Sequence, residues 1–205
     1  MPLPACLTPS CSEAGCDEAG RGCLAGPVFA AAVILPDDFS HPLLNDSKKL
    51  TARQREALEQ VIVDRATAWA VASVSPREIE KINILAASIL AMHRALDALA
   101  YSGHMPGSVI VDGNRFRPWR DAPWQTIVKG DGKYANIAAA SILAKNHRDR
   151  YMEALAERYP CYRWEVNKGY PTRDHREAIA RFGPCEEHRR TFRLLPAPTL
   201  PFLDD

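Results

Sequence analysis

Two adjacent carboxylates, Asp17 and Glu18, stand just before a turn formed by Gly20, Arg21 and Gly22. Carboxylate oxygens are the ligands that Mg²⁺ and Mn²⁺ prefer in proteins. The glycines allow backbone N–H groups to approach a polyanion closely. This arrangement suits a hard cation placed beside a phosphate, although acidic turns with glycine are also common on protein surfaces.

Two further aspartates lie far away in the sequence but in comparable positions. Asp112 ends an apolar run that begins at Ser108, and Asp131 lies in a Lys-Gly-Asp turn after a short strand-like segment. Ligands of α/β sheets bind outside the carboxyl ends of strands, so we expect these side chains to meet Asp17 and Glu18. Two divalent cations roughly 3.5–4 Å apart can activate a water and stabilise the leaving oxygen of a phosphodiester. Without metal, such a carboxylate cluster raises its own pKa values.

The adjacent pair poses a geometric problem, because successive side chains of a strand point to opposite faces. Asp17 and Glu18 therefore cannot both face one metal from a regular strand. Either the chain leaves strand geometry at Glu18, or Glu18 serves a metal edge-on or through its backbone. We expect Asp17 to be the bridging ligand.

The carboxylates are carried by an alternation of apolar strand-like and helix-like segments, which predicts an α/β fold with helices on the faces of a sheet. The expected strands are a segment ending at Asp17 and residues 28–35, 69–74, 108–112 and 125–128; the expected helices cover 51–64, a stretch from 75, 84–100, 134–158 and 172–182. Residues 83–91 and 136–144 are nearly identical, which we interpret as two small-residue helices packed closely on the sheet.

Composition and length fit one sizeable domain with short ends. The chain has 205 residues, of which 46% are hydrophobic and 25% charged. We expect a flexible lead-in over 1–12, a catalytic domain over 13–193 and a flexible tail over 194–205. No apolar run approaches the roughly 18 residues of a membrane span, and the first residues do not form a secretion signal. A cytoplasmic protein without membrane contact is predicted.

Cysteine spacing and charge distribution refine this prediction. The six cysteines do not follow zinc-site spacing, so reduced thiols are expected. The formal net charge is −3 over 1–111, +6 over 112–193 and −2 over the remainder. The basic excess of the second half suits a polyanionic partner, although an ordinary solvated basic face would have the same charge.

These motifs together resemble the ribonuclease HII family. The segments that carry the resemblance are Asp-Glu-Ala-Gly-Arg-Gly at 17–22, Leu-Ala-Gly-Pro-Val at 24–28, Asn-Asp-Ser-Lys-Lys-Leu at 45–50, Val-Asp-Gly-Asn at 111–114, Lys-Gly-Asp at 129–131, Ala-Ala-Ser-Ile-Leu-Ala-Lys at 139–145 and Lys-Gly-Tyr-Pro-Thr at 168–172. The resemblance implies a ribonuclease H-like fold, in which a central mixed sheet is flanked by helices and a small helical extension follows over about 160–193. It also implies hydrolysis of the RNA strand of RNA–DNA hybrids and nicking 5′ of single ribonucleotides embedded in DNA. The products would carry 3′-hydroxyl and 5′-phosphate ends.

The resemblance also assigns roles to individual residues. The catalytic and metal-binding carboxylates would be Asp17, Glu18, Asp112 and Asp131, with two Mg²⁺ or Mn²⁺ ions during catalysis. The backbone of Gly20, Arg21 and Gly22 would surround the 2′-hydroxyl that distinguishes RNA from DNA, and Tyr170 would stack on the next deoxyribose. Lys48, Lys49 and Lys168 would contact phosphates, although each would also fit an ordinary exposed lysine.

Some residues depart from the family pattern or have no assigned role. Cys23 stands where the family usually has proline. Trp119 and Trp124 are expected to pack beneath a loop rather than stack on nucleic acid. His175 and His188 are interpreted as phosphate contacts or simple surface residues. The segment 199–202 is a weak candidate for contact with a replication clamp.

Two alternatives remain open at this point. A different ribonuclease H-like nuclease, such as a transposase-type enzyme, would cut DNA without ribonucleotides. A nucleic-acid-binding protein with an inactive metal site would bind without turnover. A general phosphate-binding enzyme is disfavoured because the chain has no Walker-type loop.

Overall fold

A five-stranded mixed sheet forms the centre of the protein, described here from a computed structural model for residues 2–44, 47 and 50–195. Its strands are β1 (Glu13–Ala19), β2 (Val28–Ile34), β3 (Ala68–Val74), β4 (Ser108–Asp112) and β5 (Trp124–Ile127), in the order β3-β2-β1-β4-β5. β1 and β2 pair antiparallel, as do β2 and β3, whereas β4 runs parallel to both β1 and β5. The predicted α/β fold with a mixed sheet is confirmed.

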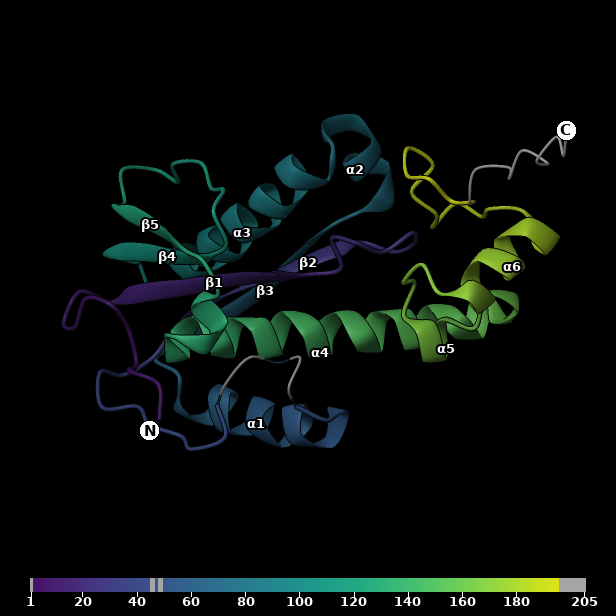
Figure 1. Ribbon diagram of the computed structural model, residues 1–205. Coiled ribbons are helices and arrows are strands. Elements are labelled where there is room, and N and C mark those ends of the chain that lie inside the picture. The colour runs from purple at the N-terminus through teal and green to yellow at the C-terminus, as the bar shows by residue number, and fades with distance from the viewer. Residues whose placement is uncertain (1, 45–46, 48–49, 196–205) are drawn as a thin grey trace, which may run out of the picture.

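Helices cover both faces of the sheet, as Figure 1 shows. On one side lie α2 (Pro76–Ile82) and α3 (Ile84–Tyr101); on the other lies α4 (Ala135–Arg158), with α1 (Ala52–Arg65) packed against it. The sequence of β2 explains why both faces are covered: its alternate residues point to opposite faces and are apolar on each, so they belong to two different cores. Ala30 and Ala32 pack with α3, and Ala31 and Val33 pack with α4. A strand buried on both faces is a continuous apolar run, as the sequence of β2 is.

Small residues allow α4 to lie very close to β1. A Cβ atom added at Gly15 would come within 2.4 Å of the backbone carbon of Asn136. The facing turns of α4 are built from buried alanines, including Ala138, Ala139 and Ala140. The small-residue segments of α3 and α4 thus lie on opposite faces of the sheet, in agreement with the packing inferred from their near-identical sequences.

A small helical extension follows α4 and lies at one end of the molecule (Figure 1). It contains a 3-10 turn, η3 (Pro160–Tyr162), a single helical turn, α5 (Trp164–Asn167), and the helix α6 (Arg173–Phe182). The Thr172 hydroxyl accepts the N–H of His175 and caps α6. The longer helices agree with the predicted ranges to within a few residues, whereas η3, α5 and a second 3-10 turn, η2 (Gly130–Gly132), were not predicted.

The first residues contact the body of the protein. The carbonyls of Pro4 and Ala5 accept hydrogen bonds from the N–H groups of Ala135 and Asn136, at 2.8 and 3.0 Å. These two donors belong to the first turn of α4, where backbone N–H groups have no partner within the helix. The division into lead-in, catalytic domain and tail stays a prediction, and residues 196–205 lie outside the described part.

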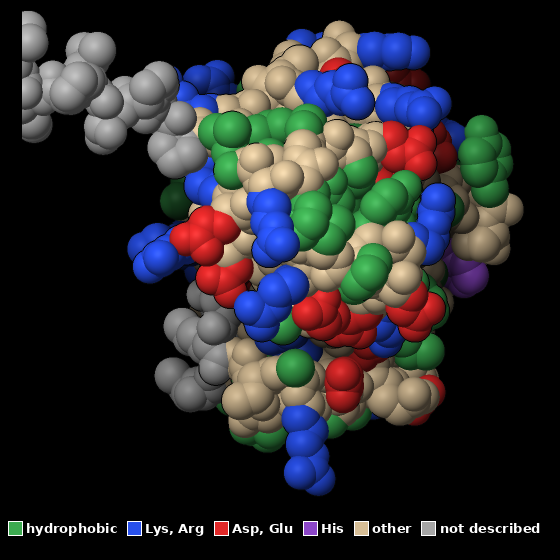
Figure 2. Space-filling view, turned by 90° about the vertical axis from the view of Figure 1, so that its right-hand side faces the viewer, with side chains coloured by type: hydrophobic (Ala, Val, Ile, Leu, Met, Phe, Trp, Pro, Cys, Tyr) green, Lys and Arg blue, Asp and Glu red, His purple; other side chains and the backbone are tan. Residues whose placement is uncertain are grey.

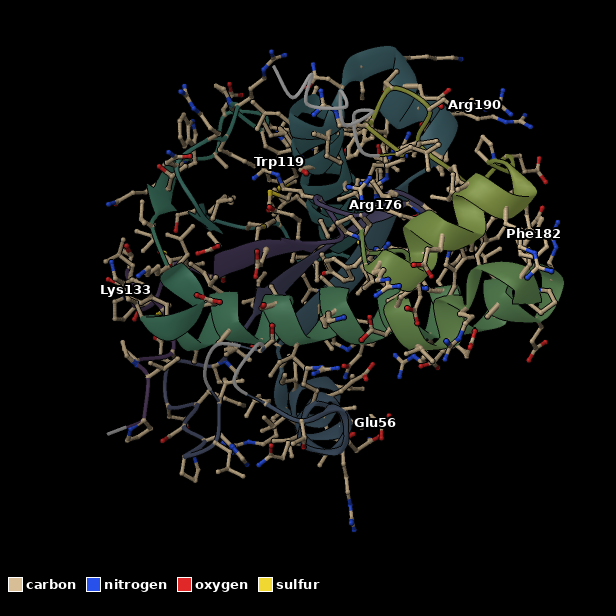
Figure 3. The ribbon with its side chains drawn as sticks, turned by 45° about the vertical axis from the view of Figure 1, so that its right-hand side comes forward. Glu56, Trp119, Lys133, Arg176, Phe182 and Arg190 are labelled. Carbon is tan, nitrogen blue, oxygen red and sulfur yellow. The ribbon has the colours of Figure 1, made fainter. Side chains whose placement is uncertain are left out.

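In the described part of the chain one helix, α3, is long and apolar enough by composition to cross a membrane, with 44% of that window buried in the fold. Core helices meet the same criterion, and α3 packs against β2 and β3. Trp119, labelled in Figure 3, is buried in the same core and donates to Asp97 of α3 at 3.0 Å, so its predicted packing role is confirmed. Trp124 contacts the ring of Phe116 in the β4–β5 loop, with 5.6 Å between centroids, but it is 42% exposed, so it is covered by that loop only in part.

Candidate active site

The parallel strands bring the carboxylate segments to one edge of the sheet. β1, β4 and β5 run in the same direction, so their carboxyl ends lie side by side. Cys16 pairs with Val111 across β1 and β4, and Asp17 and Asp112 are the residues that follow this pair. The expectation that β1 ends at Asp17 is wrong by two residues, because the strand continues to Ala19 while pairing with β2.

A pocket of about 250 Å³ opens at this edge. Its lining combines three of the predicted carboxylates, the Gly-Arg-Gly turn and the predicted junction-reading tyrosine with three further polar side chains. The lining residues are Asp17, Glu18, Ala19, Gly20, Arg21, Gly22, Ser47, Asp112, Ser141, Lys145 and Tyr170. Segments separated by more than 150 residues therefore meet in one hollow.

Asp17 is the most strongly perturbed acid of the pocket. It is only 6% exposed, and burial, followed by the charges of Glu18 and Asp112, raises its pKa well above the usual value. The hydroxyl of Ser141 and the N–H of Glu18 donate to this carboxylate and partly oppose the rise. A carboxylate in such surroundings would gain more from a divalent cation than a solvated one, because burial and like charges both oppose its ionisation.

Glu18 remains inside β1, where it pairs with Ala30, and still lines the same pocket as Asp17. Its Oε1 accepts from Arg21 Nη1 at 3.2 Å. The side chain is 15% exposed, so the ion pair lies at the mouth of the pocket rather than in open solvent. Glu18 thus reaches the pocket without a break in the strand, and its binding of a metal stays a prediction.

Asp112 and Asp131 are linked through the backbone between them. Asp112 Oδ1 accepts from the N–H of Gly130 at 2.6 Å, and Asp131 is the next residue, 5% exposed within η2. Asp131 is therefore close to the pocket but is not among the described side chains that line it. Among the described residues, no three His, Cys, Asp or Glu side chains already form a metal site, so the four-ligand set stays a prediction.

Two guanidinium groups hold the loop after Gly22 from inside the protein. Arg148 of α4 is fully buried and donates to the carbonyls of Ala25, Pro27 and Lys168 at 2.9–3.1 Å. Its charge is therefore satisfied by carbonyl oxygens of two loops that meet at the pocket. Charged donors of this kind make stronger hydrogen bonds than neutral ones.

Arg189 also donates to backbone carbonyls of this loop. It is also fully buried, and it donates to the carbonyls of Arg21 and Gly26 at 3.0 and 2.9 Å. Burial lowers its pKa to about 10, so it stays charged at neutral pH. Its Nη2 has no hydrogen-bond partner within the described residues. The Gly-Arg-Gly turn is thus fixed by side chains remote from it in sequence.

The glycine at position 20 is required by this packing. Its φ of +96° lies in the region that favours glycine, and an added Cβ would approach Arg148 Nε to 2.1 Å. Gly22 differs, since an added Cβ there would meet nothing within 4 Å among the described residues. The first glycine accommodates the buried arginine, and the second leaves the backbone open toward the pocket.

Tyr170 also lines the pocket and is 38% exposed. Two cations approach its ring: the ammonium of Lys145 at 5.6 Å and the guanidinium of Arg148 at 5.8 Å from the centroid. Its carbonyl is paired with His175 Nδ1 at 2.9 Å, and its N–H donates to the carbonyl of Asn167 at the same distance. The ring is therefore presented to the pocket by a backbone held on both sides.

The histidines behind Tyr170 form a buried chain of hydrogen bonds. Trp164 Nε1 donates to His175 Nε2 at 3.0 Å, and His188 Nε2 lies 3.2 Å from the same nitrogen. The N–H of Cys185 donates to His188 Nδ1 at 3.0 Å. Burial lowers the pKa of both histidines, that of His188 to about 4. Both sequence-based readings, phosphate contact and surface residue, are wrong, because the two side chains are no more than 1% exposed.

The predicted lysine contacts are only partly placed by the structure. Lys168 lies outside the pocket, where its ammonium donates to Glu153 Oε1 at 2.6 Å and to the carbonyl of Glu165. Lys48 and Lys49 lie outside the described residues. Phosphate binding by these three lysines stays a prediction.

Three pocket residues were missed by sequence reasoning: Ser47, Ser141 and Lys145. Ser47 and Ser141 share a hydrogen bond of 2.9 Å, and Ser141 also donates to Asp17. Ser141 and Lys145 are four residues apart on α4 and so lie on one helix face. All three lie within motifs on which the family resemblance rests, and the hydroxyl of Ser141 between apolar residues of α4 could have indicated a buried functional contact.

Sequence comparisons show which known proteins the chain is similar to. The family model described as Ribonuclease HII matches residues 14–195. Ribonuclease HII of Bacteroides fragilis is 62% identical over 183 residues, which cover 89% of this chain and 90% of the relative. Ribonuclease HII of Bacteroides thetaiotaomicron shows the same identity and coverage.

Solved structures show the same fold. Ribonuclease H2 of Pyrococcus horikoshii OT3 superposes with a TM-score of 0.72 at 28% identity, covering 89% of this chain and 94% of that one. RNase HII from the PCNA:RNase HII complex of Archaeoglobus fulgidus gives 0.73 at 28% identity, with coverages of 92% and 98%. The family match over nearly the whole chain and these relatives lead to one conclusion: the chain belongs to the ribonuclease HII family.

Proposed function

We propose that this chain is a metal-dependent endonuclease that hydrolyses the RNA strand of RNA–DNA hybrids and nicks 5′ of single ribonucleotides embedded in DNA. The products carry 3′-hydroxyl and 5′-phosphate ends. The observation that carries the proposal is one pocket that combines Asp17, Glu18 and Asp112 with the Gly20–Gly22 turn and the ring of Tyr170. Such a pocket joins groups suited to cleaving a phosphodiester with groups suited to reading a sugar.

The proposed cofactor is Mg²⁺ or Mn²⁺, with two ions during catalysis. The donors are all carboxylates, which suits hard cations, and the raised pKa of Asp17 favours a compensating positive charge. Asp17, Glu18, Asp112 and Asp131 would hold the ions. When bound, such ions lower the pKa of a water and stabilise the leaving oxygen. The protein contributes the fixed position of the carboxylates at the strand ends.

Recognition of the ribonucleotide would come from two walls of the pocket. The open backbone at Gly22 permits close approach of a sugar, so N–H and carbonyl groups of the Gly20–Gly22 turn can bond a 2′-hydroxyl. Tyr170 offers an exposed ring face to the adjacent sugar. A 2′-hydroxyl on that neighbour would crowd the ring, which gives a physical reason for a preference for an RNA-to-DNA junction.

The substrate is a duplex, and the surface outside the pocket has mixed charge. Figure 2 shows that the end of the molecule formed by the extension carries basic side chains interspersed with acidic ones. Some of these are paired, such as Arg173 with Glu177 and Arg163 with Asp174. The basic excess of the second half is therefore not a continuous patch on this face, and the pocket carries the argument for nucleic-acid binding.

The test is cleavage of a duplex that contains one embedded ribonucleotide, with Mg²⁺ or Mn²⁺ and with the product ends mapped. We expect nicking on the 5′ side of the ribonucleotide, and no activity above background for an Asp17→Asn control. Cleavage of ribonucleotide-free DNA would instead support a transposase-type nuclease. Binding without turnover in either metal would support a protein with an inactive site.

Tyr170 provides a second test of the same proposal. Tyr170→Phe keeps the ring and is expected to retain selectivity for a single ribonucleotide over a ribonucleotide-free site. Tyr170→Ala removes the ring and is expected to lose about 5- to 150-fold in rate on that substrate, taking for the sugar–ring contact the about 1–3 kcal/mol that a base stacked on an aromatic ring contributes. Equal turnover by Tyr170→Ala would remove the tyrosine from the recognition site.

Location and partners complete the proposal. We propose a cytoplasmic enzyme whose partner is nucleic acid. The clamp contact suggested for segment 199–202 lies outside the described residues. The solved complex of the Archaeoglobus fulgidus RNase HII with PCNA gives a precedent in a relative. Deletion of residues 196–205 followed by a clamp-binding assay would test it.

A further inference from the structure

A lysine on the wall of the active-site pocket has not entered the proposed reaction. Lys145 is on α4, one helical turn after Ser141, and lines the same pocket as Asp17, Glu18 and Asp112. Its side chain is 24% exposed. The ammonium is thus accessible from the pocket while most of its stem is packed against the protein.

The position of this ammonium is fixed by a partner one turn further along α4. Lys145 Nζ donates to Asp149 Oδ1 at 2.5 Å. The other oxygen of Asp149 accepts from Arg55 Nη2 of α1 at 3.3 Å. Asp149 and Arg55 are each only 13% exposed, so this link between the two helices is largely shielded from solvent and salt.

Arg55 is itself held in place by two further acceptors. Its Nη1 donates to the carbonyl of Leu50 at 3.0 Å, and its Nε donates to Asn146 Oδ1 at 3.2 Å. The chain of contacts from Arg55 through Asp149 therefore leaves Lys145 little freedom. Asp149 occupies one of the three N–H donors of the ammonium, which leaves donors that can point into the pocket.

The chemistry of the pocket indicates what this lysine would bind. Three carboxylates line the pocket, and their negative charges would repel an incoming polyanion. Among the described residues of the lining, the basic ones are Lys145 and Arg21, and Arg21 is paired with Glu18. Lys145 lies 5.6 Å from the Tyr170 ring centroid, within the range of a cation–π contact. Its charge therefore stands beside the ring proposed to receive a sugar.

We propose that Lys145 binds a backbone phosphate of the strand being cut, next to the sugar that packs on Tyr170, and that Asp149 and Arg55 are positioning residues for it. This inference rests on the proposed function, since it takes the ring of Tyr170 as the sugar site. Arg148 cannot take this role, because it is fully buried and already donates to three carbonyls. Lys145 would thus fix the register of the strand relative to the carboxylates.

The experiment measures binding and cleavage separately. Binding of a duplex with one embedded ribonucleotide is followed by fluorescence anisotropy in an Asp17→Asn background, over a series of salt concentrations. A lost phosphate contact should weaken binding about tenfold and reduce the slope of log K against log [salt] by about one. We expect both effects for Lys145→Gln, and restoration of the slope by Lys145→Arg, which keeps the charge.

Matched controls separate this contact from general electrostatics and from misfolding. Lys81→Gln removes one positive charge from an exposed position on α2, across the sheet from α4, and should leave affinity and slope unchanged. Asp149→Asn keeps the charge of Lys145 but loosens its position, so it should raise KM while leaving the salt slope unchanged. Thermal unfolding confirms that each variant is folded.

The outcomes for Lys145 and for the proposed function are distinguishable. Native affinity and slope in a folded Lys145→Gln variant would overturn the phosphate contact, even if the parent chain nicks at ribonucleotides. Equal loss in Lys81→Gln would overturn it as well. Conversely, a parent chain that fails to nick but still shows the Lys145-dependent slope would overturn the proposed reaction and leave the phosphate contact supported.

Discussion

Two buried polar clusters meet at Tyr170, and they differ in how their charges are satisfied. On the pocket side, Asp17 lies beside Glu18 and Asp112, and burial, followed by these like charges, raises its pKa. On the opposite side, His175, His188 and Trp164 are joined by hydrogen bonds in which neutral donors meet neutral acceptors. Arg148 and Arg189 belong to this second group, since carbonyl oxygens surround their charges.

The difference separates residues expected to take part in the reaction from residues that hold the loops of the site in place. A cluster of carboxylates destabilises the protein on its own and is useful when a cation completes it. The hydrogen bonds of the second group, which pair all but Arg189 Nη2 of its described buried donors, add stability and fix the backbone of the two loops that carry Gly20 and Tyr170. We therefore expect substitutions in the pocket to change activity, and substitutions in the supporting cluster to change stability first.

The largest expected effect tests the pocket side. Asp112→Asn should reduce nicking by about 10³-fold or more, because metal ligation supplies several kcal/mol of transition-state stabilisation. Its effect on stability should be small, since the amide oxygen can still accept from the N–H of Gly130. Rates on a single-ribonucleotide duplex and the midpoint of thermal unfolding are the two measurements. A collapse of the fold in this variant would remove the contrast between the clusters.

The supporting side is tested by Arg148→Met. The variant loses three hydrogen bonds from a charged donor and leaves the carbonyls of Ala25, Pro27 and Lys168 without that partner. We expect the free energy of unfolding in urea to fall by about 3 kcal/mol. Arg173→Met is the control, because Arg173 is an exposed arginine of α6 whose loss should leave the free energy of unfolding nearly unchanged. Similar losses in both variants would contradict the supporting role.

Three glycine-to-alanine substitutions test how closely the supporting arginines pack against the loop that carries Gly20. Gly20→Ala combines a positive φ with a clash against Arg148 and should cost about 2 kcal/mol, together with loss of preference for a ribonucleotide. Gly103→Ala has a positive φ of 89° but open space, so it reports strain alone. Gly22→Ala has neither problem and should leave stability unchanged. Urea unfolding of all three ranks the contributions, and equal costs at 20 and 22 would refute the packing argument.

The smallest expected effect concerns pH and the histidine pair. The pKa of His188 falls from 6.5 to about 4 on folding, so the unfolded chain takes up a proton first as pH decreases. The free energy of unfolding should therefore fall between pH 6.5 and 4, by about 1 kcal/mol from this histidine between pH 7 and 5.5. Urea unfolding at the two pH values tests this, and His188→Gln should reduce the difference. An unchanged difference would assign the pH dependence to other groups.

Much of the fold could be predicted because its strands and helices are locally encoded. The apolar run of β2, the caps at Thr51, Ser75 and Thr172, and the small-residue helices all carry periodic or capping signals. η2, η3 and α5 carry little such signal, since each is four residues or fewer. Their backbone is set by packing around α4 and the pocket rather than by their own sequence.

For the site, the residue types that could take part are evident from the amino-acid sequence alone. Adjacent carboxylates, the glycine-bracketed turn and the Lys-Gly-Tyr segment are readable without coordinates, because their chemistry is a property of the side chains. The tertiary structure decided which of them meet. It brought Asp17 and Asp112 to one edge through parallel strands, left Lys168 outside the pocket, and added Lys145 to its wall. The physical reason is that convergence depends on strand direction and helix packing, which involve contacts between residues far apart in the chain.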